Sequence, residues 1–264
     1  NTVASKTGVT VIGSGIGGLC CGGLLARGGQ EVLVLEAHSK PGGAAHGFGK
    51  TYHYESGPSL WSGLGRWPSS NPLTQILRAL GQELEVIEYR DWDVLFPEGH
   101  LRIGVGNADF EAVVQQLRGP GAVAEWQRFM QVLQPIAAAA DALPLLALRP
   151  GADVMAQLLR RGGQLLPHLG AMRHLGGALG PLVNQHLSDP FLRHWVDLLC
   201  FLISGLPMEG TNAAAMATLF GQWFEPDACL DFPKGGSKAV VMALVRGLES
   251  HGGELRLRSR VRRV

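Results

Sequence analysis

The chain has 264 residues, of which 46% are hydrophobic and only 17% are charged, whereas a typical globular protein has about 25% charged residues. This length predicts a sizeable buried core and one or two domains. The formal net charge of +1 gives no electrostatic reason to expect a nucleic-acid partner. The surplus of apolar residues is compatible with an apolar substrate, a membrane surface or a large interface with a partner.

The residues from Val9 to Glu36 carry the most informative motif in the chain. A short apolar run leads into three glycines with GxGxxG spacing, at Gly13, Gly15 and Gly18. A helix-compatible segment follows, and a second apolar run ends at Glu36. In a dinucleotide-binding fingerprint the first glycine permits a tight turn, the second admits a pyrophosphate, and the third lets helix and strand pack closely. The pyrophosphate would lie at the helix N-terminus, where unpaired N–H groups and the positive end of the dipole meet.

Glu36 stands at the end of the second predicted strand, where a carboxylate can accept hydrogen bonds from both hydroxyls of an adenosine ribose. The same charge would repel the 2′-phosphate of NADP. A second glycine pair follows in the sequence KPGG, at Gly42 and Gly43. Considered alone this pair is equally compatible with an ordinary turn. In its context it suggests that the backbone passes close to the cofactor again, as an extended FAD would require.

Further elements are predicted along the first half of the chain. Asn71 is expected to cap a helix that has Pro72 at its first position and ends at Gly81. Asp109 is expected to cap another helix that ends at Gly119. Strands are predicted at Phe48–Tyr54, Leu84–Tyr89, Val94–Phe96 and Leu101–Val105, the last two joined by a turn at residues 97–100.

From Gly121 to about Trp223 the pattern is helical and apolar, with interruptions by glycine and proline. The clearest helix is capped by Asp189 and ends at Gly205. The segment from 153 to 182 mixes leucines with basic residues, which fits either an amphipathic lid with a solvated basic face or a helix pair on a membrane surface. No run reaches the roughly 18 apolar residues that a membrane-spanning helix needs.

The remaining chemistry-bearing residues give weaker signals. The cysteines lack CxxC spacing and histidine partners, so we predict buried thiols and no metal site; they are Cys20, Cys21, Cys200 and Cys229. Trp61 is predicted to be a core residue, although it could also approach a flavin or a polyene. His46 and His53 are candidate proton donors with no assigned role. Four arginines at positions 256, 258, 260 and 262 are predicted to share one face of a strand that ends at Val264.

Taken together, four motifs resemble the carotenoid isomerase, phytoene desaturase and retinol saturase family of FAD flavoproteins. They are the fingerprint, the PGG after Glu36, the ESGPS of residues 55–59 and the FPKGGS of residues 232–237. The isomerase and saturase branch looks closer, on the strength of GPSLWSG at residues 57–63 and FPKGGS. The middle of the chain is similar to the family in character only.

The resemblance implies the residues of an FAD site. Those matching Gly13, Gly15, Gly17 and Gly18 hold the pyrophosphate, the one matching Glu36 holds the ribose, and the backbone of Val261 meets the adenine. The full expected set is Gly13, Ser14, Gly15, Ile16, Gly17, Gly18, Glu36, Lys40, Gly42, Gly43, Gly57, Pro58, Ser59 and Val261. No catalytic side chain is named, because in this family the flavin carries the chemistry.

We therefore expect an α/β fold with a Rossmann-like FAD-binding domain formed by residues 1–65 and 229–264. A mostly helical α+β substrate domain, residues 66–228, is expected to be inserted between them. The chain also looks truncated, since the family's C-terminal glycine- and acid-containing motif is missing from it. A missing segment or a partner chain is expected to complete the FAD site.

The expected activity is that of an FAD-dependent oxidoreductase acting on a long apolar polyene, as a cis–trans isomerase or as a saturase or desaturase. One alternative is a non-catalytic, flavoprotein-like scaffold subunit of a membrane-associated complex. Another is an amine-oxidase-like flavoenzyme. The expected location is a plastid membrane, or alternatively the cytoplasmic face of a bacterial membrane.

Overall fold

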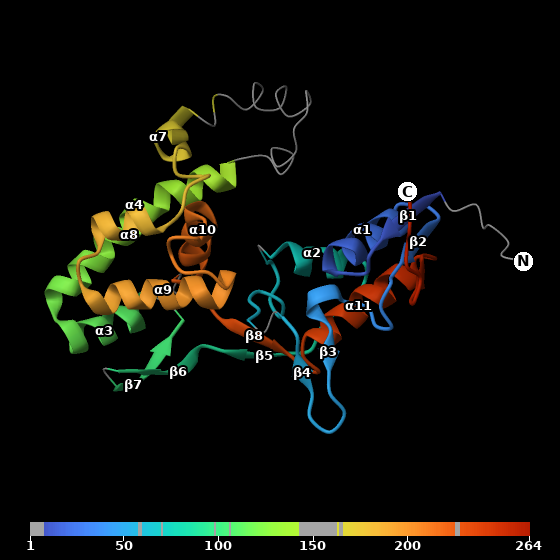
Figure 1. The fold of residues 1–264 in the computed structure, drawn as a ribbon, viewed down its shortest axis with the longest axis horizontal. Coiled ribbons are helices and arrows are strands. Elements are labelled where there is room, and N and C mark those ends of the chain that lie inside the picture. The colour runs from blue at the N-terminus through green and yellow to red at the C-terminus, as the bar shows by residue number, and fades with distance from the viewer. Residues whose placement is uncertain are drawn as a thin grey trace, which may run out of the picture. The chain divides into compact units, whose positions relative to one another are not determined.

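The computed structural model describes residues 8–57, 60–69, 71–97, 99–105, 107–142, 163, 166–224 and 228–264. The chain divides into two compact units (Figure 1). Unit 1 consists of Asn1–Arg90 and Cys229–Val264, and unit 2 of Asp91–Ala228. The first unit is therefore built from two segments that are far apart in the sequence.

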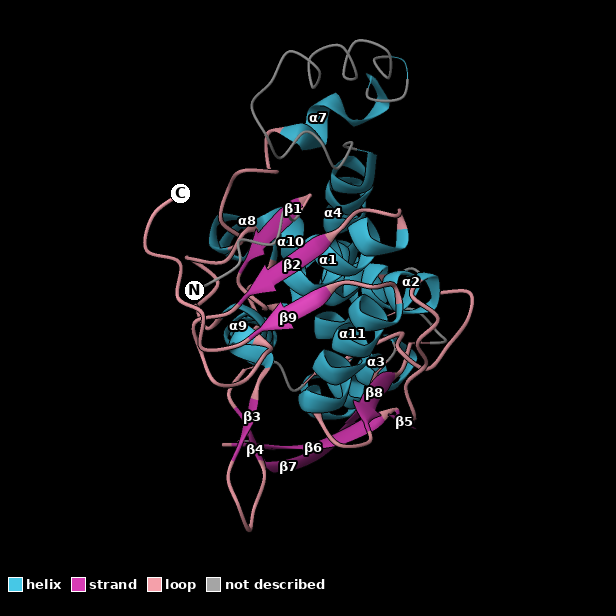
Figure 2. Cartoon of the chain, turned by 90° about the vertical axis from the view of Figure 1, so that its right-hand side faces the viewer, coloured by secondary structure: helices cyan, strands magenta, loops and turns pink. Residues whose placement is uncertain are grey.

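Unit 1 contains a parallel sheet in the order β1-β2-β9, seen side by side in Figure 2. The strands are β1 (Val9–Ile12), β2 (Val32–Leu35) and β9 (Glu254–Arg256). Helix α1 (Ile16–Arg27) connects β1 to β2, and α11 (Ser237–Ser250) precedes β9. In register, Val34 of β2 pairs with Val11 on one side and with Leu255 on the other. Parallel strands joined through helices define the Rossmann-like arrangement.

In the core of unit 1, glycines let α1 pack closely on β2 and let α11 pack closely on Leu80, the residue that follows α2. A Cβ atom on Gly22 of α1 would lie 3.0 Å from Cγ2 of Val34, and one on Gly247 of α11 would lie 2.8 Å from Cβ of Leu80. Both distances are shorter than an ordinary carbon contact, so a side chain at either glycine would displace its neighbour in the close-packed core. The fully buried side chains around them are Leu19, Val34, Leu80, Leu244 and Leu248.

Helix α2 (Pro72–Ala79) confirms the predicted helix and its caps. The Asn71 side chain accepts a hydrogen bond from the N–H of Leu73 at 2.8 Å, and the chain leaves the helix through Gly81 at φ +68°. The predicted strand at residues 84–89 is present as β5 (Val86–Tyr89), which pairs antiparallel with β8 (Leu230–Pro233). The short helix η1 (Gly43–Ala45) begins at the second residue of the second glycine pair.

The single strand predicted at residues 48–54 is wrong. The structure has two short antiparallel strands instead, β3 (Gly47–Phe48) and β4 (Tyr54–Glu55). The chain reverses between them because Gly49 adopts φ +104°, where a side chain would overlap the carbonyl oxygen of Tyr52. A hairpin therefore projects where a continuous strand was predicted.

The predicted boundary at residue 65 also differs from the observed division. Residues 66–90 belong to unit 1 rather than to unit 2. The reason is that α2 packs against α1 and α11, and β5 forms its ladder with β8. These long-range contacts link the segment to both parts of unit 1.

Unit 2 combines a β-hairpin with helices. The predicted hairpin is present and is formed by β6 (Asp91–Phe96) and β7 (Gly99–Gly104). Both strands begin earlier than predicted, and the predicted turn at residues 97–100 is too long, because Phe96 already pairs with Gly99. The longer helices are α3 (Asn107–Arg118), α4 (Pro120–Ala142), α9 (Pro190–Ser204) and α10 (Ala213–Trp223). Shorter ones are η3 (Leu166–His168), α7 (Leu169–Met172) and α8 (Gly180–His186).

The core of unit 2 is aromatic. The ring of Phe110 lies 4.8 Å from that of Trp126 and 5.0 Å from that of Trp195, measured between centroids, and all three are fully buried. Asp189 caps α9 by accepting from the N–H of Leu192 at 3.1 Å, as predicted. Helix α3 begins three residues earlier than the predicted start at Phe110, so Asp109 lies in its first turn and is not the cap.

The predicted arginine strand up to Val264 is wrong, because β9 ends at Arg256. Arg258 adopts φ +54°, which takes the chain out of the sheet, and its N–H then donates to the carbonyl of His38 at 2.9 Å. The arginines after this point share no strand face.

Among the described residues, no helix combines the length and the apolarity required to cross a bilayer. In the basic segment at 153–182, residues 153–162, 164 and 165 lie outside the described residues. The remainder includes η3, α7 and the start of α8.

Candidate nucleotide-binding site

The turn between β1 and α1 forms an open backbone loop. Gly13 adopts φ +96°, and a side chain on Gly18 would overlap the carbonyl oxygen of Gly13, so helix and strand pack as the fingerprint requires. By contrast, a Cβ atom on Gly13, Gly15 or Gly17 would meet no atom within 4 Å. In the part of the chain that the structure describes, no side chain caps the N-terminus of α1 at Gly15. The loop therefore leaves space beside a helix N-terminus, the geometry that binds phosphate groups.

Glu36 is held in place directly after β2. Its Oε2 accepts from both the N–H and the hydroxyl of Ser14 at 2.8 Å, and its Oε1 accepts from the N–H of His38 at 2.8 Å. Burial alone would raise the pKa of Glu36, but these hydrogen bonds outweigh it and hold the pKa below its ordinary value. A carboxylate offers about four lone-pair sites, so a fixed anion with room for a further donor stands beside the glycine loop.

The second glycine pair lies against the first glycine loop. The N–H of Gly42 donates to the carbonyl of Ser14 at 2.8 Å, and Gly42 forms an isolated parallel bridge with Gly15. A Cβ atom on Gly43 would lie 3.1 Å from Cα of Gly15. A side chain on Gly57 would overlap the carbonyl oxygen of Ala44. Three glycine-containing segments are thus brought together, whereas Pro58 and Ser59 lie outside the described residues.

The C-terminal segment reaches the same end of β2. The N–H of Ser259 donates to the carbonyl of Glu36 at 2.7 Å. Val261 lies two residues further along and is half-buried. The segment expected to meet adenine therefore runs beside the acid expected to hold the ribose.

A cavity of about 810 Å³ lies in unit 1, a volume within the range of small-molecule sites. The KPGG segment, the β3–β4 hairpin and the start of α11 contribute its walls. Its lining comprises Lys40, Pro41, His46, Gly47, Phe48, Gly49, His53, Tyr54, Glu55, Gly57, Phe232, Gly235, Gly236, Lys238, Val241 and Met242. Basic and aromatic side chains are therefore combined in one cavity.

Residues 16–264 match the family model described as flavin containing amine oxidoreductase. The chain belongs to this family. The match covers more than half of the sequence, and it confirms the α/β, Rossmann-like fold class that the motifs predict.

The proteins to which this chain is similar include an isomerase, a reductase and an amine oxidase. The chain is 26% identical over 99% of its length to prolycopene isomerase 1 from an Oncidium hybrid cultivar, and it covers 44% of that protein. It is 26% identical over 96% of its length to all-trans-retinol 13,14-reductase from Danio rerio, covering 42% of it. A putrescine oxidase structure overlaps with a TM-score of 0.62 at 19% identity, covering 96% of this chain and 51% of that one. The chain thus spans less than half the length of the curated relatives it matches.

Several cavity residues of this flavoprotein were not singled out from the sequence. Lys238, Val241 and Met242 of α11 line the cavity at helical spacing. The i, i+3, i+4 pattern was visible, but the sequence does not reveal that this helix face meets the β3–β4 hairpin. The candidate proton donors His46 and His53, by contrast, were named from the sequence, and both line the cavity. Nδ1 of His46 lies 2.8 Å from the carbonyl oxygen of Gly43.

The predictions for the cysteines and Trp61 are mostly confirmed. Cys20, Cys200 and Cys229 are buried, and burial raises the pKa of Cys20 and of Cys200 to about 11. Cys21 is exposed, so its predicted burial is wrong; it lies on the outer face of α1. Trp61 is buried in the core with Leu64 and Val240.

Proposed function

We propose that this protein is an FAD-dependent oxidoreductase that acts on a long apolar polyene, by isomerisation or by saturation or desaturation. The FAD part rests on the fixed carboxylate of Glu36 beside the open loop at Gly13–Gly18. The polyene part is supported by the relatives. Prolycopene isomerase matches along almost the whole chain, and human all-trans-retinol 13,14-reductase is 56% identical over 50 residues.

Each part of the cofactor has a place in this proposal. Backbone N–H groups of the first glycine loop hold the pyrophosphate, Glu36 holds the ribose, and Val261 contacts the adenine. Gly42, Gly43 and Gly57 line the flavin side. Bound FAD supplies electron or hydride transfer to the conjugated chain. The protein's own contribution is to bind, to orient and to exclude water.

The first experiment measures flavin binding directly. The chain is purified in the presence of FAD, and bound flavin is quantified by visible absorbance and by fluorescence quenching. Glu36→Gln keeps the shape of the side chain but removes its charge, and we expect it to weaken FAD binding by about tenfold, the value of one charge-assisted hydrogen bond. A colourless, stably folded wild-type chain would favour the scaffold function instead.

The second experiment identifies the substrate. The full-length protein, loaded with FAD and a reductant, is incubated with a poly-cis carotene or with retinol, and products are separated by chromatography. We expect a geometric isomer or a saturated product. Release of peroxide from a primary or secondary amine, with no polyene product, would replace the proposal by an amine oxidase.

The location of the protein is part of the same proposal. Plant prolycopene isomerases are described as chloroplastic, which supports a plastid, and an apolar substrate supports a membrane surface. Sedimentation with anionic liposomes tests the membrane association, and an absence of binding would contradict that part of the proposal.

A further inference from the structure

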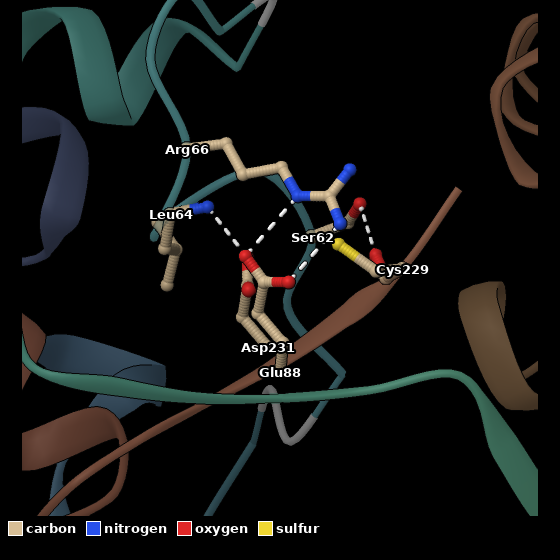
Figure 3. A network of polar contacts seen from close by, with 6 residues as sticks. All are labelled: Ser62, Leu64, Arg66, Glu88, Cys229 and Asp231. Atoms are coloured by element: carbon tan, nitrogen blue, oxygen red, sulfur yellow. Dashed lines mark hydrogen bonds and ion pairs between the residues drawn. The ribbon is translucent and has the colours of Figure 1, made fainter. Parts of the chain in front are cut away.

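A thiol and two carboxylates meet at the ribbon formed by β5 and β8 in unit 1 (Figure 3). Glu88 of β5 is the direct cross-strand partner of Asp231 of β8, and Cys229 immediately precedes β8. One carboxylate oxygen from each acid and the sulfur of Cys229 all lie within 4.8 Å of one another. None of the three residues lines the cavity described above.

Asp231 is the unusual member of this cluster, because its side chain is fully buried. Its Oδ2 accepts from the N–H of Leu64 at 2.6 Å. The N–H of Gly65 lies close enough to lower the pKa of Asp231, but among the described residues no hydrogen bond of good geometry reaches its Oδ1. Burial raises the pKa of Asp231, and the charge of Glu88 acts in the same direction. Buried carboxylates are normally paired, fully hydrogen-bonded or bound to a metal.

Arg66 lies at the open side of the cluster and gives it a partial counter-charge. Its Nε and Nη2 donate to the two carboxylate oxygens of Glu88 at 3.1 and 3.0 Å. This arrangement fixes the orientation of Glu88. The charge of Arg90 also acts on Glu88 and on Cys229, in the direction that lowers the pKa of each. Neither guanidinium separates the two carboxylates, which face each other across a strand pair, where like charges are destabilising.

We propose that Glu88, Cys229 and Asp231 bind one Zn²⁺ ion. Zinc takes thiolate and carboxylate ligands in tetrahedral sites at about 2.0 to 2.3 Å, so ligand atoms about 3.3 to 3.8 Å apart are required. The cluster reaches this spacing when its widest pair closes by roughly 1 Å. A thiolate excludes Mg²⁺ and Ca²⁺, which take oxygen ligands.

The ligands of this site carry enough negative charge for a divalent cation. The thiolate and the two carboxylates carry three negative charges, which face the ion, the guanidinium of Arg66 and the nearby charge of Arg90. Arg66 therefore keeps its hydrogen bonds to Glu88 and orients a ligand from outside, as partners of metal ligands commonly do. A water molecule completes the coordination. The ion joins β5 to β8, the strand that leads into the FPKGGS turn.

The sequence predicted no metal site because its ligands have no recognisable spacing. Glu88 and Cys229 are far apart in the chain, and only the β5–β8 ladder brings them together. Zinc motifs read from a sequence depend on short intervals between ligands.

The test uses the purified chain after treatment with a chelator. Zn²⁺ binding is measured by competition with a chromogenic chelator, and Cd²⁺ is added separately because its thiolate complex gives an ultraviolet charge-transfer band. We expect one ion per chain, a Cd²⁺ band and a rise in the midpoint of thermal unfolding with Zn²⁺. Cys229→Ser should abolish the band, whereas the matched control Cys21→Ser, which changes an exposed thiol, should keep it.

Glu88→Gln provides a second variant at an exposed position, where loss of folding is not expected. Changes in groups that only orient a ligand weaken metal binding by about 10- to 100-fold, so loss of this ligand should weaken Zn²⁺ binding by at least about tenfold. The proposal is overturned if the wild-type chain binds neither ion at micromolar concentration. It is equally overturned if the Cd²⁺ band survives Cys229→Ser and disappears in Cys21→Ser.

Discussion

Single glycine positions decide the geometry of the phosphate loop, and they do so for opposite reasons. Gly18 is needed because a side chain there would overlap the carbonyl of Gly13, whereas a side chain on Gly17 would point into open space. Two neighbouring residues of one motif therefore differ in what they contribute. Gly18 allows the helix to pack against the strand, and Gly17 leaves space for a ligand beside the loop.

This difference predicts opposite effects for two similar variants. Gly18→Ala should lower the free energy of unfolding by about 1–3 kcal/mol, the usual cost of overpacking. Gly17→Ala should raise it by about 0.5–1 kcal/mol, since alanine is favoured within a helix, but should weaken FAD binding. Urea unfolding and flavin titration measure both quantities. Equal destabilisation by the two variants would contradict the geometry.

Asp231 should make the metal-free protein less stable as the pH rises, which is the opposite of the usual effect of a carboxylate. Its pKa is raised by burial above the ordinary 3.8, so the folded chain binds this proton more tightly than the unfolded chain does. The stabilisation is present below the ordinary pKa and is lost as the pH rises through the raised value. Asp231→Asn should therefore gain stability relative to the wild type between about pH 4 and pH 7. The control is Asp141→Asn on the exposed surface of α4; parallel curves for all three proteins would refute this expectation.

Glu36 should contribute a pH dependence of stability with the sign that is usual for a carboxylate. Its pKa is lowered, because the hydrogen bonds from His38 and Ser14 outweigh burial. Its contribution is present above the unfolded pKa and is lost as the pH falls through the lowered value. Ser14→Ala removes the hydroxyl donor and should cost about 1 kcal/mol at neutral pH, with a smaller cost in acid. A pH-independent cost, measured by urea unfolding, would show that the hydroxyl acts through packing instead.

At the level of elements, prediction succeeded where local chemistry marks both ends. Helix α2 has Asn71 at its start and Gly81 at its end, and both signals were legible. Prediction failed where a long-range contact determines the path of the chain. At Arg258, for example, the chain leaves the sheet and the N–H of Arg258 donates to the carbonyl of His38. The cavity wall from α11 and the cluster at Asp231 were equally hidden, because each depends on strand pairing or helix packing between distant segments.

Helix α9 offers a test of capping in unit 2. Asp189 caps the helix at Leu192 and also pairs with Arg118 at 2.9 Å. Asp189→Ala should cost about 1–2 kcal/mol, since it removes a cap as well as an ion pair. Arg118→Ala removes only the partly exposed ion pair and should cost less than about 1 kcal/mol. Thermal unfolding separates the two, and equal losses would mean that the cap contributes little.

At the scale of the whole molecule, the two units have separate cores, one around Val34 and Leu244 and the other around Phe110 and Trp126. The glycine loops, Glu36 and the cavity all belong to unit 1. A ligand held by these residues stabilises the state that binds it by about 2.7 kcal/mol when its concentration is 100 times its Kd.

Adding FAD should therefore protect one unit more than the other. We expect slower amide hydrogen exchange in α1, β2 and α11, because FAD binding makes opening of unit 1 less favourable. Exchange in α4 and α10 should change little, since no residue of unit 2 contributes to the proposed cofactor site. Mass spectrometry of peptides from each element, with and without FAD, measures the difference.

Glu36→Gln at the same FAD concentration is the control and should show weaker protection. Uniform protection of both units would mean that the whole chain opens as one body, and protection confined to unit 2 would remove the FAD site from the glycine loops.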